Sequence, residues 1–382
     1  MPPHSSIRIL AIGKHIGFAG GIERHVFQTA RAFREAGMAV DYAGEAASRD
    51  ADCFRGVFSR VFPLAEAADA PADYDLVLLH KLCPLPALRQ LRRKYGDRLI
   101  FIAHDHDLYC MRHHYYTPFG RCNCHRPCSL WRCGLCSRLS SPRQWSRSPL
   151  ESWRLLRELR GHRAVALSEF MRGNLLRNGF GGDKVALIHP FVEPAETPRR
   201  HFMPDGVLRI LFLGQLIRGK GCDLLLRALE RLQRPFRLVV AGDGNDRAML
   251  EAMSASPELA GRVLFTGWLN EPERLLRHCD VLAFPTRWQE PFGLGGLEAM
   301  AQGVPVVAFN DGGVGEWLRD GVTGLAVPPG DIAGFAASLA RLHDERGLAQ
   351  SLGLNAISCA RREFSKAGFM QAMASLAAAA AS

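Results

Sequence analysis

The sequence predicts an α/β protein with two parallel, doubly wound domains in a chain of 382 residues. Short apolar runs alternate with segments of helical period, which is typical of parallel sheets covered by helices. Both halves open in the same way, with an apolar run that ends in glycine, at Ile7–Gly13 and at Leu208–Gly214. Between the halves, residues 193–206 are rich in proline and charged residues, as expected of a linker.

The first half begins with a strand, a glycine-rich loop and a helix. The run at 7–13 leads into a loop with three glycines, and apolar residues at helical spacing follow over Ile22–Ala36. Further strands are expected at Met38–Tyr42, Leu76–Leu79, Leu99–Ala103 and Val165–Leu167. Residues 105–150 break the rhythm, so we interpret them as an inserted functional or metal-bound loop.

The second half repeats the alternation. Strands are predicted at Leu208–Gly214, Arg237–Ala241, Val263–Thr266, Asp280–Pro285 and Pro305–Phe309, and helices at Cys222–Arg234, Arg247–Ala255, Glu271–His278 and Gly293–Gln302. We therefore expect an N-terminal domain over 1–195 with the insertion at 105–150, a second domain over 205–355, and a helical tail over 356–382 that frays at its end. Because ligands bind outside the carboxyl ends of such strands, we expect a ligand cleft between the domains.

Composition and charge restrict the class of partner. The chain has no run of eighteen apolar residues and no signal-peptide pattern at its start, so we expect a cytoplasmic protein without a spanning helix. Its formal net charge of +10 suits an anionic partner, such as a nucleotide or an anionic lipid surface. Because the basic residues are dispersed and no nucleic-acid-binding motif is present, we expect no nucleic-acid partner.

The segment from Glu290 to Glu298 carries the strongest functional signal. It follows a predicted strand and opens a predicted helix, with glycines between its two glutamates. Glycine lets backbone N–H groups approach a ligand closely, and the start of a helix favours a phosphate. Glu298 can accept hydrogen bonds from ribose hydroxyls, and Glu290 in the loop can meet a sugar. Taken alone, the segment is equally an ordinary turn followed by a solvated glutamate.

The neighbouring sequence resembles glycosyltransferase family 4, whose members are retaining enzymes. Glu290 and Glu298 match the family's Glu-x7-Glu pattern, and the match continues through Ala299–Val307, Gly312–Glu316 and Asp320–Pro329. In the first half it is looser, through Gly20–Arg24, His104–Asp105 and Ser168–Glu169. The resemblance implies a GT-B fold, with two Rossmann-like domains facing each other across a cleft.

The resemblance also implies roles for residues of the second domain. Glu298 would bind the donor ribose, Glu290 would contact the transferred sugar, and backbone amides around Phe292, Gly293 and Leu294 would meet the sugar or the diphosphate. Gly242 and Thr266 resemble the family's loops around the base, although both also fit plain strand-end turns. Such enzymes need no metal at the donor site and no cofactor for transfer.

Without a metal, cationic side chains must neutralise the charge of the diphosphate. Electrostatic stabilisation of a leaving group commonly makes a large contribution to catalysis. The candidate segment is Gly214–Gly221, in which Lys220 matches the family pattern. Gln215 stands where the family usually has arginine, and a neutral amide cannot supply the cationic fork of an arginine. Arg218 is the candidate that compensates for this difference.

Three residues of the first half are candidates for the facing side of the site. Gly20 and Gly21 follow the first strand. We interpret them as contacts to the donor phosphate or the acceptor, and the alternative is an ordinary turn between a strand and a helix. His104 follows the strand at 99–103, and the family has a histidine there that contacts the transferring sugar. A lone histidine can equally be structural. Asp105, His106 and Asp107 are weaker candidates.

The insertion contains a cysteine cluster within fifteen residues: Cys122, Cys124, Cys128, Cys133 and Cys136. In a reducing compartment this pattern favours a metal or free thiols over disulfides. Cys133 and Cys136 have a common metal-ligand spacing, but the other spacings match no standard finger. Three interpretations stay open, namely a structural zinc, reduced thiols packed in a loop, and a redox-active or iron–sulfur site. Cys110, His113, His114 and His125 lie nearby.

Residues 143–163 carry arginines at 143, 147, 154, 157, 160 and 163, with tryptophans at 145 and 153. Trp153, Leu156 and Leu159 form an apolar stripe beside the basic one. This pattern fits a helix that docks on an anionic membrane, and it fits equally well a helix of the first domain with a solvated basic face.

Together, these features predict a retaining hexosyltransferase-type enzyme. It would transfer a sugar from a UDP- or GDP-linked donor to a glycan or lipid-linked acceptor during bacterial cell-surface polysaccharide or lipopolysaccharide assembly. We expect it in the cytoplasm or on the cytoplasmic face of the inner membrane. The alternative is a catalytically inactive GT-B protein that only binds a sugar nucleotide, with Gln215 marking the loss of donor use.

Overall fold

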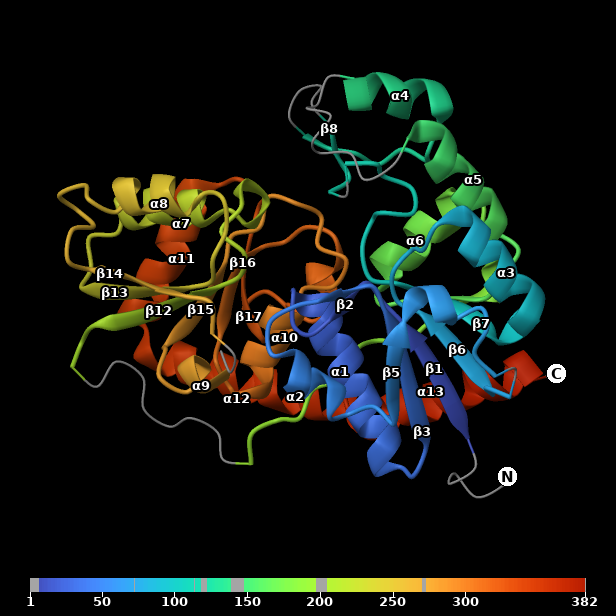
Figure 1. Cartoon of the computed structure of the whole chain (residues 1–382). Coiled ribbons are helices and arrows are strands. Elements are labelled where there is room, and N and C mark those ends of the chain that lie inside the picture. The colour runs from blue at the N-terminus through green and yellow to red at the C-terminus, as the bar shows by residue number, and fades with distance from the viewer. Residues whose placement is uncertain are drawn as a thin grey trace. The chain divides into compact units, whose positions relative to one another are not determined.

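The computed structural model describes residues 7–71, 73–112, 114–117, 122–138, 148–196, 205–269 and 273–381, which form two compact units (Figure 1). The first unit runs to Pro190 and includes the chain from Lys366 onward, and the second comprises Phe191–Ser365. The region expected as a tail is thus divided. Helix α12 (Arg346–Glu363) belongs to the second unit and α13 (Lys366–Ala381) to the first.

The first unit is built on a seven-stranded sheet in the order β11-β10-β7-β6-β1-β3-β5, in which all strands are parallel. The strands are β1 (Arg8–Ile12), β3 (Ala39–Gly44), β5 (Arg60–Pro63), β6 (Leu76–Leu79), β7 (Leu99–Ala103), β10 (Ala164–Ala166) and β11 (Val185–Leu187). Its helices besides α13 are α1 (Gly21–Glu35), α2 (Ala51–Arg55), α3 (Leu85–Tyr95), α4 (Leu130–Arg138), α5 (Pro149–Leu159) and α6 (Glu169–Arg177). Two small sheets pair β2 (His15–Ile16) with β4 (Ala46–Ala47), and β8 (Tyr116–Thr117) with β9 (Cys122–Asn123).

The second unit has a six-stranded parallel sheet in the order β14-β13-β12-β15-β16-β17. The strands are β12 (Leu208–Leu213), β13 (Phe236–Ala241), β14 (Val263–Gly267), β15 (Val281–Phe284), β16 (Val306–Phe309) and β17 (Gly324–Val327). The helices besides α12 are α7 (Cys222–Leu229), α8 (Arg247–Met253), α9 (Glu273–Leu276), α10 (Leu294–Ala301) and α11 (Ile332–Asp344). Short 3-10 turns lie at Leu64–Glu66, Gly96–Arg98, Gly182–Lys184, Arg218–Lys220 and Gly313–Glu316.

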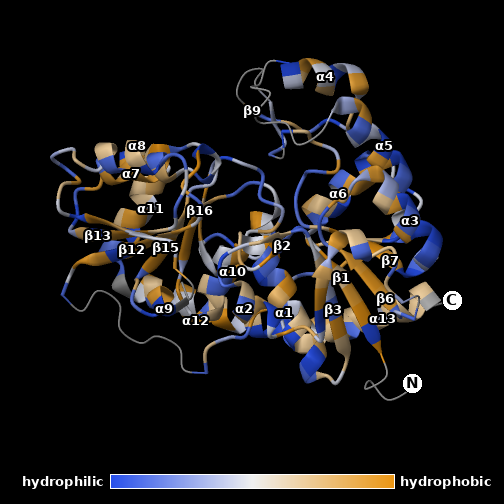
Figure 2. Cartoon of the chain, viewed as in Figure 1, coloured by the Kyte–Doolittle hydropathy of each residue, from blue (hydrophilic) through white to orange (hydrophobic). Residues whose placement is uncertain are grey.

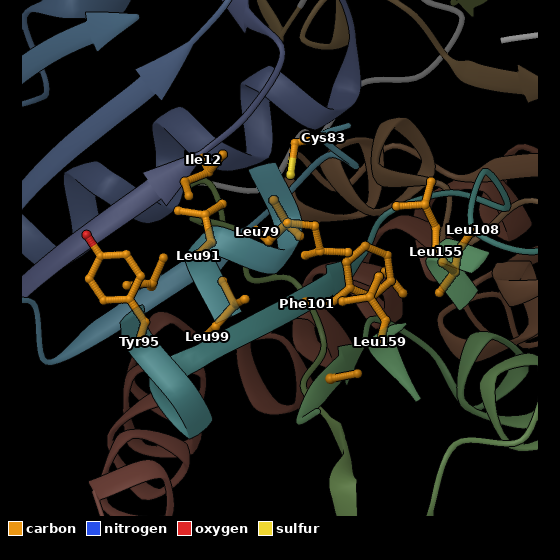
Figure 3. Close-up of a cluster of buried hydrophobic side chains, with 14 of the residues drawn as sticks. Ile12, Leu79, Cys83, Leu91, Tyr95, Leu99, Phe101, Leu108, Leu155 and Leu159 are labelled. Carbon is orange, nitrogen blue, oxygen red and sulfur yellow. The ribbon is translucent and has the colours of Figure 1, made fainter. Parts of the chain in front are cut away.

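The strands β6, β7, β15 and β16 are apolar along their whole length, as expected where helices cover both faces of a sheet. Every residue of β6 and of β7 is buried, and the strands of both units stand out as hydrophobic in Figure 2. In the first unit, the core side chains of the strands pack with those of α3 and α5 (Figure 3): Ile12, Leu79, Leu99 and Phe101 from the strands, Leu91 and Tyr95 from α3, and Leu155 and Leu159 from α5.

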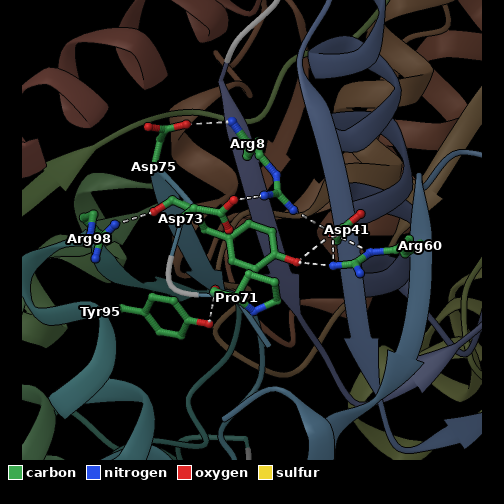
Figure 4. A network of polar contacts seen from close by, with 9 residues as sticks. Arg8, Asp41, Arg60, Pro71, Asp73, Asp75, Tyr95 and Arg98 are labelled. Atoms are coloured by element: carbon green, nitrogen blue, oxygen red, sulfur yellow. Dashed lines mark hydrogen bonds and ion pairs between the residues drawn. The ribbon is translucent and has the colours of Figure 1, made fainter. Parts of the chain in front are cut away.

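A polar network joins β1, β3 and β5 toward their amino ends (Figure 4). The buried carboxylate of Asp41 accepts hydrogen bonds from the Tyr74 hydroxyl at 2.6 Å and from Arg60 Nε at 3.1 Å. Arg8 donates its backbone N–H to Asp75, which precedes β6, at 2.7 Å. These residues stabilise the sheet and leave its carboxyl edge, at the opposite ends of the strands, for ligands.

The structure confirms the two α/β units and nearly every predicted element, with ends that differ by a few residues. In the two large sheets, the strands β5, β11 and β17 were not predicted, and each lies at an outer edge of its sheet. The two-residue strands β2, β4, β8 and β9 were not predicted either. No helix in the described part of the chain is long and apolar enough to cross a membrane.

Candidate functional site

The carboxyl edge of the second sheet holds the predicted donor-site residues. The strand order of this sheet reverses between β12 and β15, and a crevice at such a reversal is the usual ligand site of an open α/β sheet. The predicted residues lie in, or soon after, the carboxyl ends of four strands: Gln215, Arg218 and Lys220 after β12, Gly242 after β13, Thr266 in β14, and Glu290, Phe292, Gly293, Leu294 and Glu298 after β15.

Lys220 and Glu290 meet at this reversal. Lys220 Nζ lies 2.6 Å from Glu290 Oε1, which also accepts a hydrogen bond from the Thr286 hydroxyl at 2.9 Å. The Glu290 side chain is 8% exposed and that of Lys220 is 29% exposed. The ion pair therefore orients a fixed carboxylate and presents a lysine ammonium, with its three donors, at the edge of the sheet.

The loop that carries Lys220 is closely packed against the loop after β15. A Cβ on Gly219 would lie 1.8 Å from Trp288 Cε2, and a Cβ on Gly221, whose φ is +73°, would lie 1.8 Å from the Pro285 carbonyl oxygen. Arg287 donates its backbone N–H to Gly219 O at 2.8 Å. Only glycine fits these two positions without displacing the loop.

An ion pair that the sequence did not reveal holds the two loops together. The guanidinium of Arg287 binds both carboxylate oxygens of Asp223 on α7 and also donates to Arg218 O at 2.7 Å. Both side chains are mostly buried. This bidentate pair fixes the backbone on either side of Lys220.

The glycine loop before α10 adopts the conformation that its sequence requires. Gly293 is the N-cap of α10 with φ +91°, and a Cβ on Gly296 would lie 2.2 Å from the Trp317 ring. Trp317 Nε1 donates to the Phe292 carbonyl at 2.7 Å, while the Phe292 side chain is buried. The first amides of a helix have no acceptor within the helix, so this loop can offer N–H groups to an anion. Glu298 is half-buried on the same helix.

The other predicted donor residues have varied surroundings. Gln215 and Arg218 are exposed beside the Lys220 loop. Gly242 has φ +149°, and a Cβ there would lie 1.8 Å from Gly214 O, so the loops after β12 and β13 are in close contact. The Thr266 hydroxyl lies 3.1 Å from Gly267 O. Base contacts by Gly242 and Thr266 stay predictions.

The carboxyl edge of the first sheet gathers three histidines. This sheet also reverses its order, between β1 and β6. His80 directly follows β6, His104 directly follows β7, and His25 lies on α1, just after the predicted Gly20 and Gly21. His80 Nδ1 lies 2.8 Å from His104 Nε2, and the His25 and His104 ring centroids are 5.0 Å apart.

Burial keeps these histidines neutral. Desolvation lowers the pKa of His25 to about 4 and that of His80 to about 3, and it lowers the pKa of His104 well below its usual value. Sequence reasoning identified His104 and missed His25 and His80. Their only signal was position, because His80 follows a predicted strand and His25 lies one turn into the helix after the first glycine loop.

The acidic residues after His104 are engaged with a lysine. Lys81 contacts the carboxylates of Asp105 and Asp107. Burial lowers the pKa of Lys81, and the two carboxylates raise it by more, so the ammonium stays charged. His106 is buried, and its Nδ1 lies 2.9 Å from the Tyr109 hydroxyl.

Comparison with known proteins identifies the family. The family described as Glycosyltransferase Family 4 matches residues 19–196, and the family described as Glycosyl transferases group 1 matches residues 195–358. The chain belongs to glycosyltransferase family 4. Together the two matches cover the glycine loop and histidines of the first unit and the Lys220–Glu290 pair of the second.

The curated relatives of this chain differ in the reactions and pathways for which they are named. It is 33% identical to glycogen synthase of Mycobacterium tuberculosis over 45% of the chain and 43% of that protein. It is 33% identical to a lipopolysaccharide core biosynthesis glycosyltransferase of Rhizobium meliloti, over 36% of this chain and 40% of that protein. It is 27% identical to D-inositol 3-phosphate glycosyltransferase of Pseudarthrobacter chlorophenolicus, over 88% of this chain and 85% of that protein. The chain spans less than half the length of the first two relatives.

Solved structures agree on the fold. Anabaena HepE in complex with UDP and glucose superposes with a TM-score of 0.75 at 18% identity, covering 98% of this chain and 100% of that one. Sucrose-phosphate synthase from Thermosynechococcus elongatus superposes with a TM-score of 0.73 at 20% identity, covering 98% and 100%. At this identity the likeness shows the GT-B fold alone, which confirms the predicted fold class.

In this member of family 4, the cysteine-rich segment contains a close pair of thiols, Cys128 and Cys133. A hydrogen bond from Cys128 lowers the pKa of Cys133, and Ser129 N–H, 3.4 Å from the same sulfur, adds to this effect. Among the described residues, which include all five predicted cysteines and Cys110, no three thiols lie within 4.8 Å of one another. Zinc binding by Cys122, Cys124, Cys128, Cys133 and Cys136 stays a prediction, and His113 lies outside the described residues.

The predicted basic helix is part of the first unit. Leu156 and Leu159 of α5 are fully buried in the core, so the apolar stripe faces inward there. Arg157 lies over the Trp153 ring, 4.7 Å from its centroid, and both Arg154 and Arg157 are exposed. The structure favours the interpretation as a domain helix with a solvated basic face. Residues 143, 145 and 147 lie outside the described residues.

Proposed function

We propose that this family-4 enzyme transfers a hexose, with retention of anomeric configuration, from a UDP- or GDP-linked donor to a glycan or glycolipid acceptor. The observation that carries the proposal is the Lys220–Glu290 ion pair at the strand reversal of the second sheet, 2.6 Å between Nζ and Oε1. A cation from the loop after β12 pairs with a carboxylate from the loop after β15, and the second loop leads into the free amides at the start of α10. These are the groups that a nucleotide sugar requires, which supports the proposal.

The proposed donor contacts follow from charge and position. Lys220 meets the diphosphate as it leaves with negative charge, and Arg218 adds positive charge beside it. The amides of Gly293 and Leu294 approach the phosphate or the sugar at the start of α10. Glu298 accepts hydrogen bonds from the ribose, and Glu290, held by Thr286, contacts the sugar hydroxyls. Because the charge is met by side chains and amides, the donor site needs no metal ion.

The acceptor is proposed to lie at the carboxyl edge of the first sheet. His104 follows a strand there, and a neutral imidazole can donate or accept a hydrogen bond with a sugar hydroxyl. Gly20 and Gly21 begin α1 at the same edge. The relative of Rhizobium meliloti named for lipopolysaccharide core biosynthesis supports a cell-surface glycan as the acceptor class.

The donor proposal is tested by thermal shift and calorimetry of the full chain with UDP, GDP, ADP and their hexose conjugates. Because a ligand of the folded state raises the melting temperature, one nucleotide should stabilise the protein selectively. The complexes of HepE with UDP and with UDP-glucose make UDP the first candidate. If none of these compounds binds, the donor proposal is wrong.

Chemistry is tested separately, with the donor that binds and a panel of glycan and glycolipid acceptors. Proton NMR of the early product should show the anomeric configuration of the donor, and brief exposure to EDTA, too short to remove a tightly held structural ion, should leave the rate unchanged. Inversion of configuration would contradict the retaining mechanism, and a loss of rate that magnesium restores would contradict metal independence at the donor site. Donor binding without hydrolysis or transfer to any acceptor would favour the inactive binding protein.

A membrane-bound acceptor is also proposed, with α4 as the contact. Trp131 is 90% exposed and Leu135 is 54% exposed on this helix, beside the exposed Arg132. Exposed aromatic and aliphatic side chains next to a cation are typical of an interfacial helix. The protein should bind anionic vesicles, and Trp131→Ser should weaken that binding severalfold. Leu354→Ser, which alters an exposed apolar residue on α12, is the matched control.

A further inference from the structure

The histidine cluster at the strand reversal of the first sheet has the geometry of a metal site. One ring nitrogen from each of His25, His80 and His104 lies within 4.8 Å of the others, and all three side chains are buried. No other set of three potential ligands in the described ranges meets this criterion. Ring nitrogens around one tetrahedral zinc lie about 3.3 Å apart, given Zn–N bonds of about 2.0–2.1 Å. Small side-chain shifts would therefore bring the cluster to ligand geometry.

One histidine of the cluster has no hydrogen-bond partner. His25 is 4% exposed, and neither of its ring nitrogens has a hydrogen-bond partner. Buried polar groups in native proteins are nearly always paired, because an unpaired one loses its hydration without compensation. The single hydrogen bond between His80 and His104 leaves His25 out. A ligand that binds all three rings would satisfy it.

The chemistry of the cluster selects a class of ligand. Neutral imidazoles present lone pairs, and three of them form the ligand set of a zinc-type divalent ion that keeps a fourth position open. Lys81 is the charged group that acts on His104, and it is paired with the carboxylates of Asp105 and Asp107. Because these two carboxylates offset the ammonium, its charge does not exclude a cation from the cluster.

We propose that His25, His80 and His104 bind one divalent transition-metal ion of the zinc class at the carboxyl edge of the first sheet. This site is separate from the donor site, for which no metal is proposed. An imidazole that binds a metal through one nitrogen keeps an N–H on the other, and this N–H commonly donates a hydrogen bond. His104 can therefore bind the metal and still contact a sugar hydroxyl.

The test uses the full chain without an affinity tag, stripped of metal and titrated with Co²⁺. We expect saturation at one ion per chain, with the visible bands of four-coordinate cobalt and without the near-ultraviolet band of sulfur-to-cobalt charge transfer. The spectrum thereby separates the histidine site from the cysteine-rich segment, which would give the sulfur band. Absence of a saturable, sulfur-free signal in the wild-type chain would overturn the proposal.

Variants locate the ion. His25→Ala and His80→Ala should each weaken Co²⁺ binding at least tenfold. His162→Ala is the matched control, because His162 is also buried in the first unit and neither of its ring nitrogens has a partner, yet it lies outside the cluster. The double variant Cys133→Ser/Cys136→Ser should retain the cobalt signal. Unchanged affinity in His25→Ala, with folding verified by circular dichroism, would overturn the proposal, and nucleotide binding measured alongside shows whether the donor site is intact.

Discussion

The two units share a strand order and the same edge of the sheet, yet they gather different kinds of side chain there. In the second unit, the loops after β12 and β15 bring Lys220 and Glu290 into an ion pair. In the first unit, the corresponding strands β1 and β6 are followed by His25 and His80, whose burial keeps them neutral. The exposed fraction also differs, because Lys220 is 29% exposed and His25 is 4% exposed.

This difference separates the contribution of the fold from that of the loops. The strand order determines which loops meet, since the carboxyl ends of neighbouring parallel strands lie at one edge. The residues of those loops then determine what binds. A partly exposed lysine retains its charge and suits a diphosphate, whereas buried neutral imidazoles suit uncharged hydroxyls or a cation that needs lone pairs.

Lys220→Met should give the largest effect. The change keeps the side-chain volume and removes the cation that meets the leaving diphosphate, so kcat should fall about 10²–10³-fold, as when one charge-stabilising donor is removed from an active site. Glu290 would also lose its ammonium partner and keep only the hydrogen bond from Thr286, at a cost of about 1–3 kcal/mol in stability. Initial rates with saturating donor and a thermal melt measure the two effects.

Lys184→Met is the control for this change, because Lys184 bonds to Gly161 O on the first unit, away from both strand reversals. It should leave the rate unchanged. If Lys220→Met retained most of the wild-type rate, the lysine at the edge of the second sheet would not be needed for transfer. The difference in charge between the two units would then not explain their roles.

Glu298→Ala should weaken donor binding by about 10–100-fold, since hydrogen bonds to a charged group are worth about 1.5–3 kcal/mol. The carboxylate is half-buried on α10, four residues after its start. Calorimetry with the nucleotide and with the free base separates a ribose contact from a general loss of the pocket. An unchanged dissociation constant would remove Glu298 from the donor site.

Gly219→Ala tests whether the Lys220 loop must keep its close packing. The new Cβ would lie 1.8 Å from the Trp288 ring, so the loop or the ring must move, which costs about 1–3 kcal/mol. The melting temperature and the donor affinity should both fall. Gly347→Ala, where a Cβ meets nothing within 4 Å, should be neutral. Equal behaviour of the two variants would mean that the loop adapts without cost.

The sequence predicted the interior strands of both large sheets and missed three edge strands, β5, β11 and β17, although the edge strand β14 was predicted. Interior strands such as β6 and β7 read as continuous apolar runs. The missed strand β5 contains no fully buried residue, and β11 has three residues of which one is buried, so neither shows a clear period. The fold class could still be predicted without these edge strands. The interior strands and the helices between them already show the alternation that is typical of a parallel α/β sheet.

The donor site was predictable because its signals are local. Glu290, Glu298 and the glycines between them occupy one short segment, and Lys220 lies near the end of a second, Gly214–Gly221. The histidine cluster was not predictable in this way, since His25 and His80 lie on segments far apart in the sequence. They meet only because β6 pairs with both β1 and β7, a fact that periodicity does not reveal. The Arg287–Asp223 pair was missed for the same reason.

Gln215→Arg should have the smallest effect and would sharpen the comparison between the units. Gln215 is exposed at the edge of the second sheet, where arginine is usual in the family. An added guanidinium near Lys220 and Arg218 would raise the local positive charge, but an exposed ion pair contributes only about 0.2–1 kcal/mol, so donor affinity should rise about two- to fivefold. Salt should reduce the gain, because exposed charges are screened. A large, salt-insensitive gain would mean that position 215 is covered when the donor binds, whereas a loss of affinity would mean that the glutamine itself contacts the donor.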